Sequence, residues 1–401
     1  MDSQGIEQLC RAEAFDHATG EFTLRETHIS WVILCGDYAY KLKKPVDFGF
    51  LDFSSLERRQ HYCEEELRLN RRFSPELYLA VVAVTQGPDG PVMAGPGETI
   101  DYAVKMRRFD ESQLLDNIAA RDGLDPQLVR SIARELARLH GQLPGCSPDP
   151  SGTGAGTPAA LHAALQQNFT QLRQYPLRDT EQQQVDAVEH WALARYDELL
   201  ATMQQRVRDG WVIDGHGDDH LGNMAIIDGA VRLFDCIEFN ADFRVLDSIA
   251  EVALLDMDIN ARGHPAESYR LLSDYLEYRG DFAGLALLDL YRVYFALVRA
   301  KVNLLQHPPD HPHIAHTDAY GELCRYLEMA HRYCQPRRRF LAITYGLSGS
   351  GKSTVAARLV EASGAVRIRS DVERKRLFGL APEEHSRPDD EAVLYLSLIH
   401  I

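Results

Sequence analysis

The chain has 401 residues, of which 45% are hydrophobic and 25% charged, and its formal net charge at pH 7 is −16. This length exceeds that of one ordinary compact domain, and the composition is that of a soluble globular protein with enough apolar residues for a core. The acidic balance argues against general nucleic-acid binding, which needs a basic surface. We therefore expect two or three folded parts and no nucleic-acid partner.

Targeting and redox features point to the cytoplasm. No apolar run approaches the roughly 18 residues of a membrane span, and the N-terminus lacks the basic and apolar regions of a signal peptide. The seven cysteines are odd in number and form no CxxC pair. Free thiols in a reducing compartment fit this pattern better than disulfides or zinc. We expect a cytoplasmic protein without a membrane partner.

The first 110 residues are predicted to form a small β-rich lobe. Residues 31–34 and 38–42 flank a Cys-Gly-Asp turn, which is a hairpin signal. Residues 54–57, Ser-Ser-Leu-Glu, form an N-cap box for the helix that follows. Two further strands are expected at residues 79–84 and 100–107, with a turn rich in Gly and Pro between them.

Residues 111–335 are predicted to form a larger helical lobe. Asp125 and Pro126 begin a helix with a regular apolar face, and helices resume over residues 161–208. Residues 211–243 contain a strand-turn-strand hairpin with polar motifs, and apolar helices fill residues 245–305. The expected fold class is an α+β, two-lobed, protein-kinase-like fold, followed by a partial α/β P-loop unit.

The hairpin region carries the residues that phosphoryl transfer needs. His216-Gly217-Asp218 is followed by Asn223 and, after a short strand-turn-strand, by Asp235. A carboxylate at Asp218 can orient or deprotonate an acceptor hydroxyl, so Asp218 and Asn223 are the catalytic candidates. Asn223 and Asp235 offer the oxygen ligands that Mg²⁺ prefers, which predicts a site for Mg²⁺ and ATP phosphates.

Over residues 20–330, these motifs resemble those of the aminoglycoside phosphotransferase-like kinases. The whole chain is similar to bacterial two-part proteins that join such a domain to a C-terminal P-loop kinase-like ATPase. The resemblance implies the use of ATP and Mg²⁺ and transfer to a hydroxyl of a small molecule. It leaves the identity of the acceptor open.

Two features of the small lobe differ from those of protein kinases. The lobe has no G-x-G-x-x-G loop, and we expect the turn at residues 27–30, Thr-His-Ile-Ser, to cover the phosphates instead. Residues 47–49 spell Asp-Phe-Gly, the metal motif of protein kinases, but they precede the catalytic loop. The order is therefore wrong, and the metal role stays with Asp235.

The small lobe should supply a lysine to the α- and β-phosphates. Lys41 fits this role in the middle of a strand, and Lys43 has the same strand parity and is the alternative. The ion-pair partner should come from the next helix, where Glu64 is favoured over Glu65 and Glu66 because Cys63 and Leu67 are expected on the buried stripe. Met106 lies in the strand whose backbone is expected to hold the adenine.

A second phosphate-binding signature lies in residues 338–401, the expected P-loop unit. An apolar strand at residues 340–345, a Gly-rich turn and a helix match the P-loop pattern, in which backbone N–H groups hold phosphates. Lys352 would neutralise the β- and γ-phosphate oxygens, and Ser353 would bind Mg²⁺. The predicted nucleotide-binding residues are Gly346, Gly349, Gly351, Lys352, Ser353 and Thr354.

Two predictions about the C-terminal part and one about the function of the chain remain open. Asp371 is a possible acceptor contact. Only about sixty residues follow the expected strand, fewer than a P-loop kinase domain needs, so we expect a truncated or artefactual end. The leading function is transfer of the ATP γ-phosphoryl group to a small hydroxylated acceptor. The alternatives are an ATP-binding sensor (a pseudokinase) and a small-molecule kinase whose activity resides in the P-loop part.

Overall fold

The computed structural model describes residues 1–49, 51–146, 154–302, 304–308, 313–347 and 349–384. These residues belong to two compact units. Unit 1 comprises Met1–Arg121 and His216–Arg244, and unit 2 comprises Asp122–Gly215 and Val245–Ile401. Among the described residues, no helix combines the length and the hydropathy that crossing a bilayer requires.

The described part of unit 1 is built on a six-stranded sheet in which every neighbouring pair of strands is antiparallel. The strand order is β1-β2-β3-β6-β4-β5. The strands are β1 (Thr23–Glu26), β2 (Ser30–Cys35), β3 (Tyr38–Lys43), β4 (Tyr78–Gly87), β5 (Gly90–Met93) and β6 (Thr99–Arg107). The predicted hairpin around residues 35–37 is confirmed as β2 and β3.

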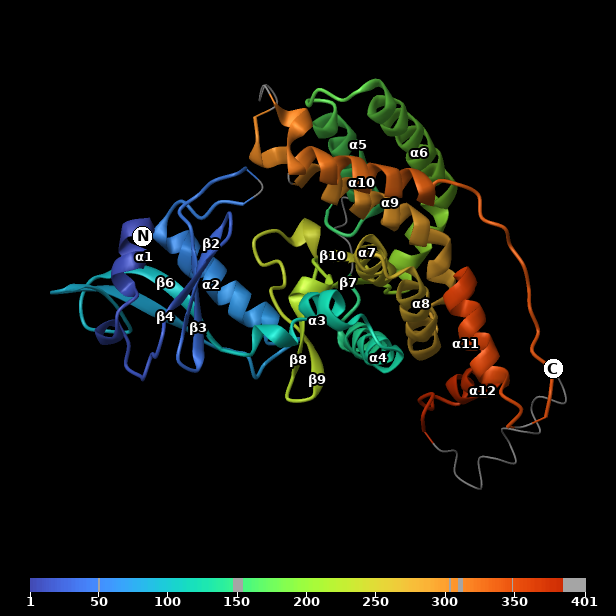
Figure 1. Cartoon of the computed structure of the whole chain (residues 1–401), viewed down its shortest axis with the longest axis horizontal. Helices are drawn as coiled ribbons and strands as arrows, with labels where there is room; N and C mark the ends of the chain where they lie inside the picture. The colour runs from blue at the N-terminus through green and yellow to red at the C-terminus, as the bar shows by residue number, and fades with distance from the viewer. Residues whose placement is uncertain (50, 147–153, 303, 309–312, 348, 385–401) are drawn as a thin grey trace. The chain divides into compact units, whose positions relative to one another are not determined.

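The two faces of this sheet are covered by different segments (Figure 1). Helix α1 (Ser3–Leu9) packs Ile6 and Leu9 against one face, which presents Tyr40 and Leu42 of β3. Helix α2 (Leu56–Asn70) packs Cys63 with Tyr78 and Val104 on the other face. Because side chains alternate along a strand, Lys41 and Lys43 point toward the α2 face.

Helix α2 begins where its sequence predicts. Ser55 is the N-cap, and its hydroxyl accepts a hydrogen bond from the Arg58 N–H at 3.3 Å. The buried stripe of the helix follows the i, i+3 spacing through Cys63, Glu66 and Leu69. This stripe turns a carboxylate inward at Glu66, while Glu64 is exposed.

The sequence predicts only a turn between β4 and β6, and this prediction is wrong. Strand β5 lies within that segment and pairs with the end of β4, with Val84 opposite Met93. Glycines make the segment look irregular in the sequence, yet they serve this tight hairpin: Gly90 has φ +116°, a value that L side chains rarely adopt. The ladder with β4, a non-local feature, decides the conformation.

Unit 1 continues after the helical insertion with the hairpin of β8 (Met224–Ile227) and β9 (Ala230–Leu233). Helix α3 (Leu115–Asp122) ends where the chain passes from unit 1 to unit 2. Unit 2 contains a two-stranded sheet and helices. They are α4 (Pro126–Gln142), α5 (Pro158–Leu172), α6 (Asp179–Arg208), β7 (Val212–Asp214), β10 (Val245–Asp247), α7 (Ser248–Ala261), α8 (Pro265–Arg279), α9 (Leu285–Val302), α10 (Asp318–Tyr333), α11 (Lys352–Ser363) and α12 (Ser370–Leu377).

A buried charged cluster joins distant segments of unit 2. The Arg206 guanidinium binds Asp247 and Asp281, each at 2.6 Å, and the exposed fractions of the three side chains are 3% or less. Asp247 also caps α7 by accepting the N–H of Ile249 at 3.0 Å. The predicted cap of α4 is confirmed, since Asp125 accepts two backbone N–H groups.

The predicted strand at residues 340–345 is wrong. The structure assigns no strand to the described residues there, and the exposed fractions of Leu341, Ile343 and Tyr345 are 88%, 85% and 100%. A parallel strand is stable when neighbouring strands and helices cover it, and none of the described residues does so here. The helix after the turn does form, as α11, and it runs beside α8 (Figure 1).

Candidate functional site

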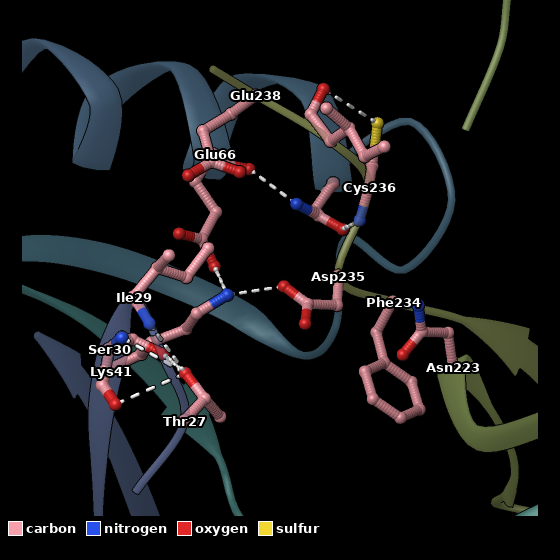
Figure 2. Close-up of polar contacts among 12 residues, drawn as sticks. Thr27, Ile29, Ser30, Lys41, Glu66, Asn223, Phe234, Asp235, Cys236 and Glu238 are labelled. Atoms are coloured by element: carbon pink, nitrogen blue, oxygen red, sulfur yellow. Dashed lines mark hydrogen bonds and ion pairs between the residues drawn. The ribbon is translucent and has the colours of Figure 1, made fainter. Parts of the chain in front are cut away.

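A hairpin brings the predicted catalytic and metal-binding residues together. Asn223 ends a short 3₁₀ helix, β8 and β9 follow, and the chain returns at Phe234, whose N–H donates to the Asn223 carbonyl at 3.0 Å. Asn223 and Asp235 are therefore near neighbours although twelve positions separate them, and they lie on either side of Phe234 (Figure 2). The two candidate Mg²⁺ ligands therefore lie close together, and their metal role stays a prediction.

Asp218 is held with its carboxylate partly open to solvent. The Asn223 side-chain amide donates to Asp218 Oδ2 at 3.0 Å and to the Asp218 carbonyl at 3.1 Å. His220 Nε2 lies 3.3 Å from the same Oδ2. With 38% of its side chain exposed, the carboxylate is oriented by its neighbours and accessible to an acceptor hydroxyl.

His216 connects the catalytic loop to the segment that carries Asp235. Its Nε2 lies 2.9 Å from the Phe234 carbonyl oxygen, and its own carbonyl accepts the N–H of Ile237 at 3.1 Å. The ring is 1% exposed and packs edge-on against Phe73. The sequence-based interpretation of His216 as a structural hydrogen-bonding residue is confirmed.

Gly217 is required by the backbone. Its φ is +83°, and a Cβ at this position would lie 2.7 Å from the Phe243 carbonyl oxygen and 2.9 Å from Arg244 Cα. An L side chain would meet backbone atoms, which cannot move aside easily. The glycine before Asp218 thus allows the loop to pass close to residues 243–244.

Asp235 has a backbone conformation that non-glycine residues rarely adopt. Its φ is +64°, and its N–H donates to the Tyr78 hydroxyl at 3.0 Å. The next N–H, that of Cys236, donates to Asn70 Oδ1 at 2.8 Å. Contacts from β4 and α2 on both sides of the residue hold this conformation, as is typical of functional positions.

Lys41 in β3 reaches residues 235–238, the predicted metal-binding segment, which carries Asp235. Its ammonium contacts Glu66 Oε1 at 2.9 Å and also forms an ion pair with Asp235 (Figure 2). The predicted partner Glu64 is therefore wrong: Glu64 is exposed and accepts the Gln60 amide at 2.9 Å. Leu67 does pack against the same apolar cluster as Cys63, but Glu66 beside it is fully buried, which the sequence-based choice did not allow for.

Lys43, the alternative in the sequence, lies in the same cluster. It contacts Glu66 Oε2 at 2.7 Å and forms an ion pair with Glu238. Glu238 was missed by sequence reasoning. Two signals could have indicated it: a carboxylate three residues after Asp235, and a second lysine on the same face of β3 that would need a partner.

These ion pairs determine the protonation of the cluster. Burial opposes the charge of Lys41, but Asp235 and Glu66 raise its pKa well above the ordinary value of 10.5. Burial favours the neutral form of Glu66, yet Lys41 and Lys43 bring its pKa below 4.5. Burial raises the pKa of Glu238 more than Lys43 lowers it. Both lysines are therefore cationic at neutral pH, and Glu66 is anionic.

The donor set of Asn223 and Asp235 fits Mg²⁺. Both residues offer oxygen, the ligand atom that Mg²⁺ prefers, and 45% of the Asp235 side chain is exposed. The Asn223 Nδ2 group is engaged with Asp218, which leaves the amide oxygen available. In this structure Asp235 forms its ion pair with Lys41.

The turn between β1 and β2 is ordered without glycine. Thr27 Oγ1 accepts the N–H of Ser30 at 3.0 Å and that of Ile29 at 3.4 Å (Figure 2). The same hydroxyl lies 2.8 Å from the Ser30 hydroxyl. A hydroxyl thus fixes this turn, and its predicted role over the phosphates remains a prediction.

A cavity of about 620 Å³ lies at one edge of unit 1. The start of β3, the residues after β6 and the turn after β8 contribute to its lining, with Tyr38, Arg108, Phe109 and Asp228 among the lining residues. Met106 is half-buried in β6 and packs with the α2 face of the sheet. Neither Met106 nor Lys41 lines this cavity, so it does not coincide with the predicted nucleotide site.

The P-loop residues have the local conformation that the motif predicts. Gly346, Gly349 and Gly351 have φ values of +151°, +78° and +82°, and α11 begins at Lys352. The Lys352 ammonium donates to the carbonyls of Gly346 at 2.8 Å and Leu347 at 2.6 Å. Its hydrogen bonds are made to its own loop. Ser348 of the motif lies outside the described residues.

The other candidates of this segment are placed separately. Ser353 and Thr354 are exposed in the first turn of α11. Asp371 lies in the first turn of α12 and forms an ion pair with Arg369 at 2.7 Å. Burial raises the pKa of Asp371, but the hydrogen bond and charge of Arg369 together with backbone hydrogen bonds lower it more, so the net shift of this pKa is downward. The acceptor role of Asp371 stays a prediction.

Relatives identify the family. The chain is 31% identical over 387 residues to the uncharacterized protein Rv2004c of Mycobacterium tuberculosis and to the uncharacterized protein Mb2027c of Mycobacterium bovis. The match covers 94% of this chain and 72% of each relative. The chain belongs to their family. The AAA domain family matches residues 341–399, the part of the chain that contains the P-loop motif.

Solved structures show distant similarity. A choline/ethanolamine kinase family protein from Mesorhizobium loti is 12% identical with a TM-score of 0.48, covering 89% of this chain and 99% of that chain. The GDP complex of aminoglycoside 2'-phosphotransferase-IIIa is 14% identical with a TM-score of 0.48, covering 82% and 99%. The ADP-bound aminoglycoside phosphotransferase APH(2'')-Ib is 16% identical with a TM-score of 0.47, covering 82% and 99%.

Proposed function

We propose that unit 1 transfers the γ-phosphoryl group of ATP to a hydroxyl of a small molecule in the presence of Mg²⁺. The observation that carries this proposal is the convergence of Asp218, Asn223 and Asp235 beside the Lys41–Glu66 ion pair. These side chains come from four separate segments of the sequence. Such a set suits the positioning and charge stabilisation on which phosphoryl transfer depends.

Asp218 acts on the acceptor. Its Oδ2 accepts from Asn223 and faces His220, so the carboxylate has a fixed direction when the acceptor hydroxyl arrives. The hydroxyl donates its hydrogen bond to Asp218, and the proton moves to the carboxylate as the oxygen bonds to phosphorus. The leaving group is the β-phosphate oxygen, so the products are ADP and a phosphate ester.

Lys41 and the oxygen ligands act on the nucleotide. The Lys41 ammonium is held by Glu66 and directed at the same space as Asp235, where it can bind phosphate oxygens. Asn223 and Asp235 would hold Mg²⁺, which when bound neutralises the phosphate charge. Lys41, which forms an ion pair with Asp235 in this structure, would then be available to the phosphate oxygens.

The test is ATP turnover with Mg²⁺ across a panel of small hydroxylated and aminated compounds. The full chain is compared with Asp218→Asn, which keeps the shape and removes the charge. We expect the substitution to lower acceptor-dependent turnover by about 10²–10⁴-fold. Asp242→Asn is the matched control, because Asp242 is an exposed carboxylate in the same unit. It should change turnover by less than about twofold.

The same panel separates the rival functions. Turnover that persists in Asp218→Asn but disappears in Lys352→Ala would contradict our proposal and place the reaction in the P-loop segment. ATP binding without transfer to any acceptor would favour a sensor. The hydrogen bonds of Lys352 to its own loop and the exposed residues 340–345 support the assignment to unit 1.

A further inference from the structure

Unit 1 contains a second lysine–glutamate ion pair that the proposed reaction does not use directly. Lys43 lies two residues after Lys41, and Glu238 lies three residues after Asp235. Their side chains form an ion pair, and their exposed fractions are 1% and 4%. Buried charges are rare unless they are paired. Lys41, Lys43, Glu66 and Glu238 form a cluster in which each buried charge has a partner of opposite sign.

Glu66 divides its two oxygens between the lysines. Oε1 lies 2.9 Å from Lys41 and Oε2 lies 2.7 Å from Lys43. Each lysine then contacts one carboxylate of the segment from Asp235 to Glu238. Strand β3, helix α2 and the metal-binding segment are therefore joined at two points rather than one. Lys43 also lies 4.9 Å from the centre of the Phe53 ring, which covers this end of the cluster.

The second pair adds no net charge. Lys41 and Lys43 contribute +2, while Glu66, Asp235 and Glu238 contribute −3, which leaves −1. Removing Lys43 and Glu238 together also leaves −1. The Lys43–Glu238 pair therefore does not change the net charge that attracts a cation. Its effect is on the position of the residues around it.

We infer that Glu238, through Lys43, is a positioning residue that fixes Asp235 for Mg²⁺ while Lys41 is free to leave for the phosphates. When Lys41 exchanges Asp235 for phosphate, the first link between β3 and the metal-binding segment is lost. The Lys43–Glu238 pair is the link that remains, and it keeps the strained Asp235 backbone in place. This inference rests on the function proposed above for unit 1.

The experiment measures the Mg²⁺ affinity directly. Mg²⁺ is titrated by calorimetry into the full chain with a non-hydrolysable ATP analogue, and all proteins carry Lys352→Ala to silence the P-loop. The test variant combines Lys43→Met with Glu238→Leu, which removes both partners of the second pair and also the Lys43 contact of Glu66 Oε2. We expect its half-saturating Mg²⁺ concentration to rise about tenfold, with a lower unfolding temperature because this Glu66 oxygen loses its Lys43 contact.

A matched control lies next in the sequence. Lys44 and Glu26 form an ion pair in which 58% of the glutamate side chain is exposed. The variant with Lys44→Met and Glu26→Leu removes the same pair of charges from the surface. Its half-saturating Mg²⁺ concentration should stay within about twofold of the parent, because exposed pairs contribute little.

An unchanged Mg²⁺ affinity in the Lys43→Met, Glu238→Leu variant would overturn the inference. If that variant lacks a cooperative unfolding transition, the variant Glu238→Gln is measured in its place. A Mg²⁺ affinity of Glu238→Gln within about twofold of the parent would also overturn the inference. Because binding is measured without an acceptor, failure to find a substrate leaves this test intact. If Asp218→Asn loses phosphoryl transfer while the Lys43→Met, Glu238→Leu variant keeps its Mg²⁺ affinity, the proposed function is supported and the positioning role of Glu238 is overturned.

Discussion

The protein has two lysines predicted to bind phosphate, and their surroundings differ. Lys41 lies in β3 with 11% of its side chain exposed and forms ion pairs with Glu66 and Asp235. Lys352 begins α11 and donates to the carbonyls of Gly346 and Leu347 in its own loop. Lys41 depends on segments that are far apart in the sequence, whereas Lys352 depends on its neighbours.

This difference shows what a local motif can supply. The glycines of the P-loop have positive φ values, and the predicted helix after the turn begins at Lys352. The strand that should precede them is absent from the described residues, since its apolar side chains have no sheet to join. A short motif fixes its turn, but a phosphate site also needs tertiary support.

The largest expected contrast, in both stability and turnover, is between substitution of Lys41 and substitution of Lys352. Lys41→Met leaves Glu66 buried beside Asp235 with one cation fewer, so we expect a decrease of about 3–5 kcal/mol in the free energy of unfolding. Phosphoryl transfer should fall by about 10²–10³-fold. The measurements are urea unfolding and kcat/KM for the acceptor found in the panel.

Lys352→Ala is the counterpart. The residue is half-buried and its side chain donates to carbonyls of its own loop, so the unfolding free energy should change by less than about 0.5 kcal/mol. Turnover should remain within about twofold of wild type. A larger loss of turnover in Lys352→Ala than in Lys41→Met would reverse the comparison.

Gly217 tests how far the catalytic loop depends on its tight backbone. We expect Gly217→Ala to lower the unfolding free energy by more than about 2 kcal/mol, because a positive φ and overlap with Phe243 both oppose a Cβ. Gly229→Ala is the control: its φ is +77°, and a Cβ there meets no atom within 4 Å. Gly229→Ala should lower the unfolding free energy by only about 1 kcal/mol. Equal decreases for Gly217→Ala and Gly229→Ala would refute the steric argument.

The pKa of Glu66 predicts a pH dependence of stability. In the folded protein this pKa is lowered below 4.5 by Lys41 and Lys43, despite the opposing effect of burial. The stabilisation is therefore fully present above pH 4.5 and is lost as the pH falls through the lower folded value. Urea unfolding of wild type and Glu66→Gln between pH 3 and 7 measures it, and the difference in unfolding free energy should shrink toward low pH. A difference that grows toward low pH would contradict the sign.

The smallest effect is local and concerns the P-loop segment. Amides of residues 340–347 should exchange with solvent far faster than those of β3, because the segment lacks a ladder and exposes its side chains. Hydrogen exchange by mass spectrometry measures both peptides in one sample. If addition of ATP slows the exchange of residues 340–347 only, the P-loop is stabilised by nucleotide; protection equal to that of β3 without ATP would contradict the structure.

Much of unit 1 could be predicted because its signals are local, and the same holds for the start of α4. The caps at Ser55 and Asp125, the hairpin around residues 35–37 and the order of Asp218, Asn223 and Asp235 are all readable from short stretches. Turn chemistry and strand alternation act within a few residues, so they are visible in the sequence.

The errors arise where a partner decides the outcome. The sequence favours Glu64 over Glu66 because the rotation of α2 about its axis depends on what the helix packs against. Strand β5 is not predicted because its pairing with β4 is not encoded in its own residues. Glu238 is missed because only the folded sheet brings Lys43 to it.

The order of residues along the chain is enough to establish the chemistry available to this protein: which carboxylates, amide and lysines it has, and how they follow one another. Which lysine meets which carboxylate depends on the folded molecule, because ion pairs across residues 41, 66 and 238 require the packing of β3, α2 and the metal-binding segment. The absence of a strand among the described residues 340–345 has the same cause, since a strand is stabilised by neighbours that its own residues cannot supply.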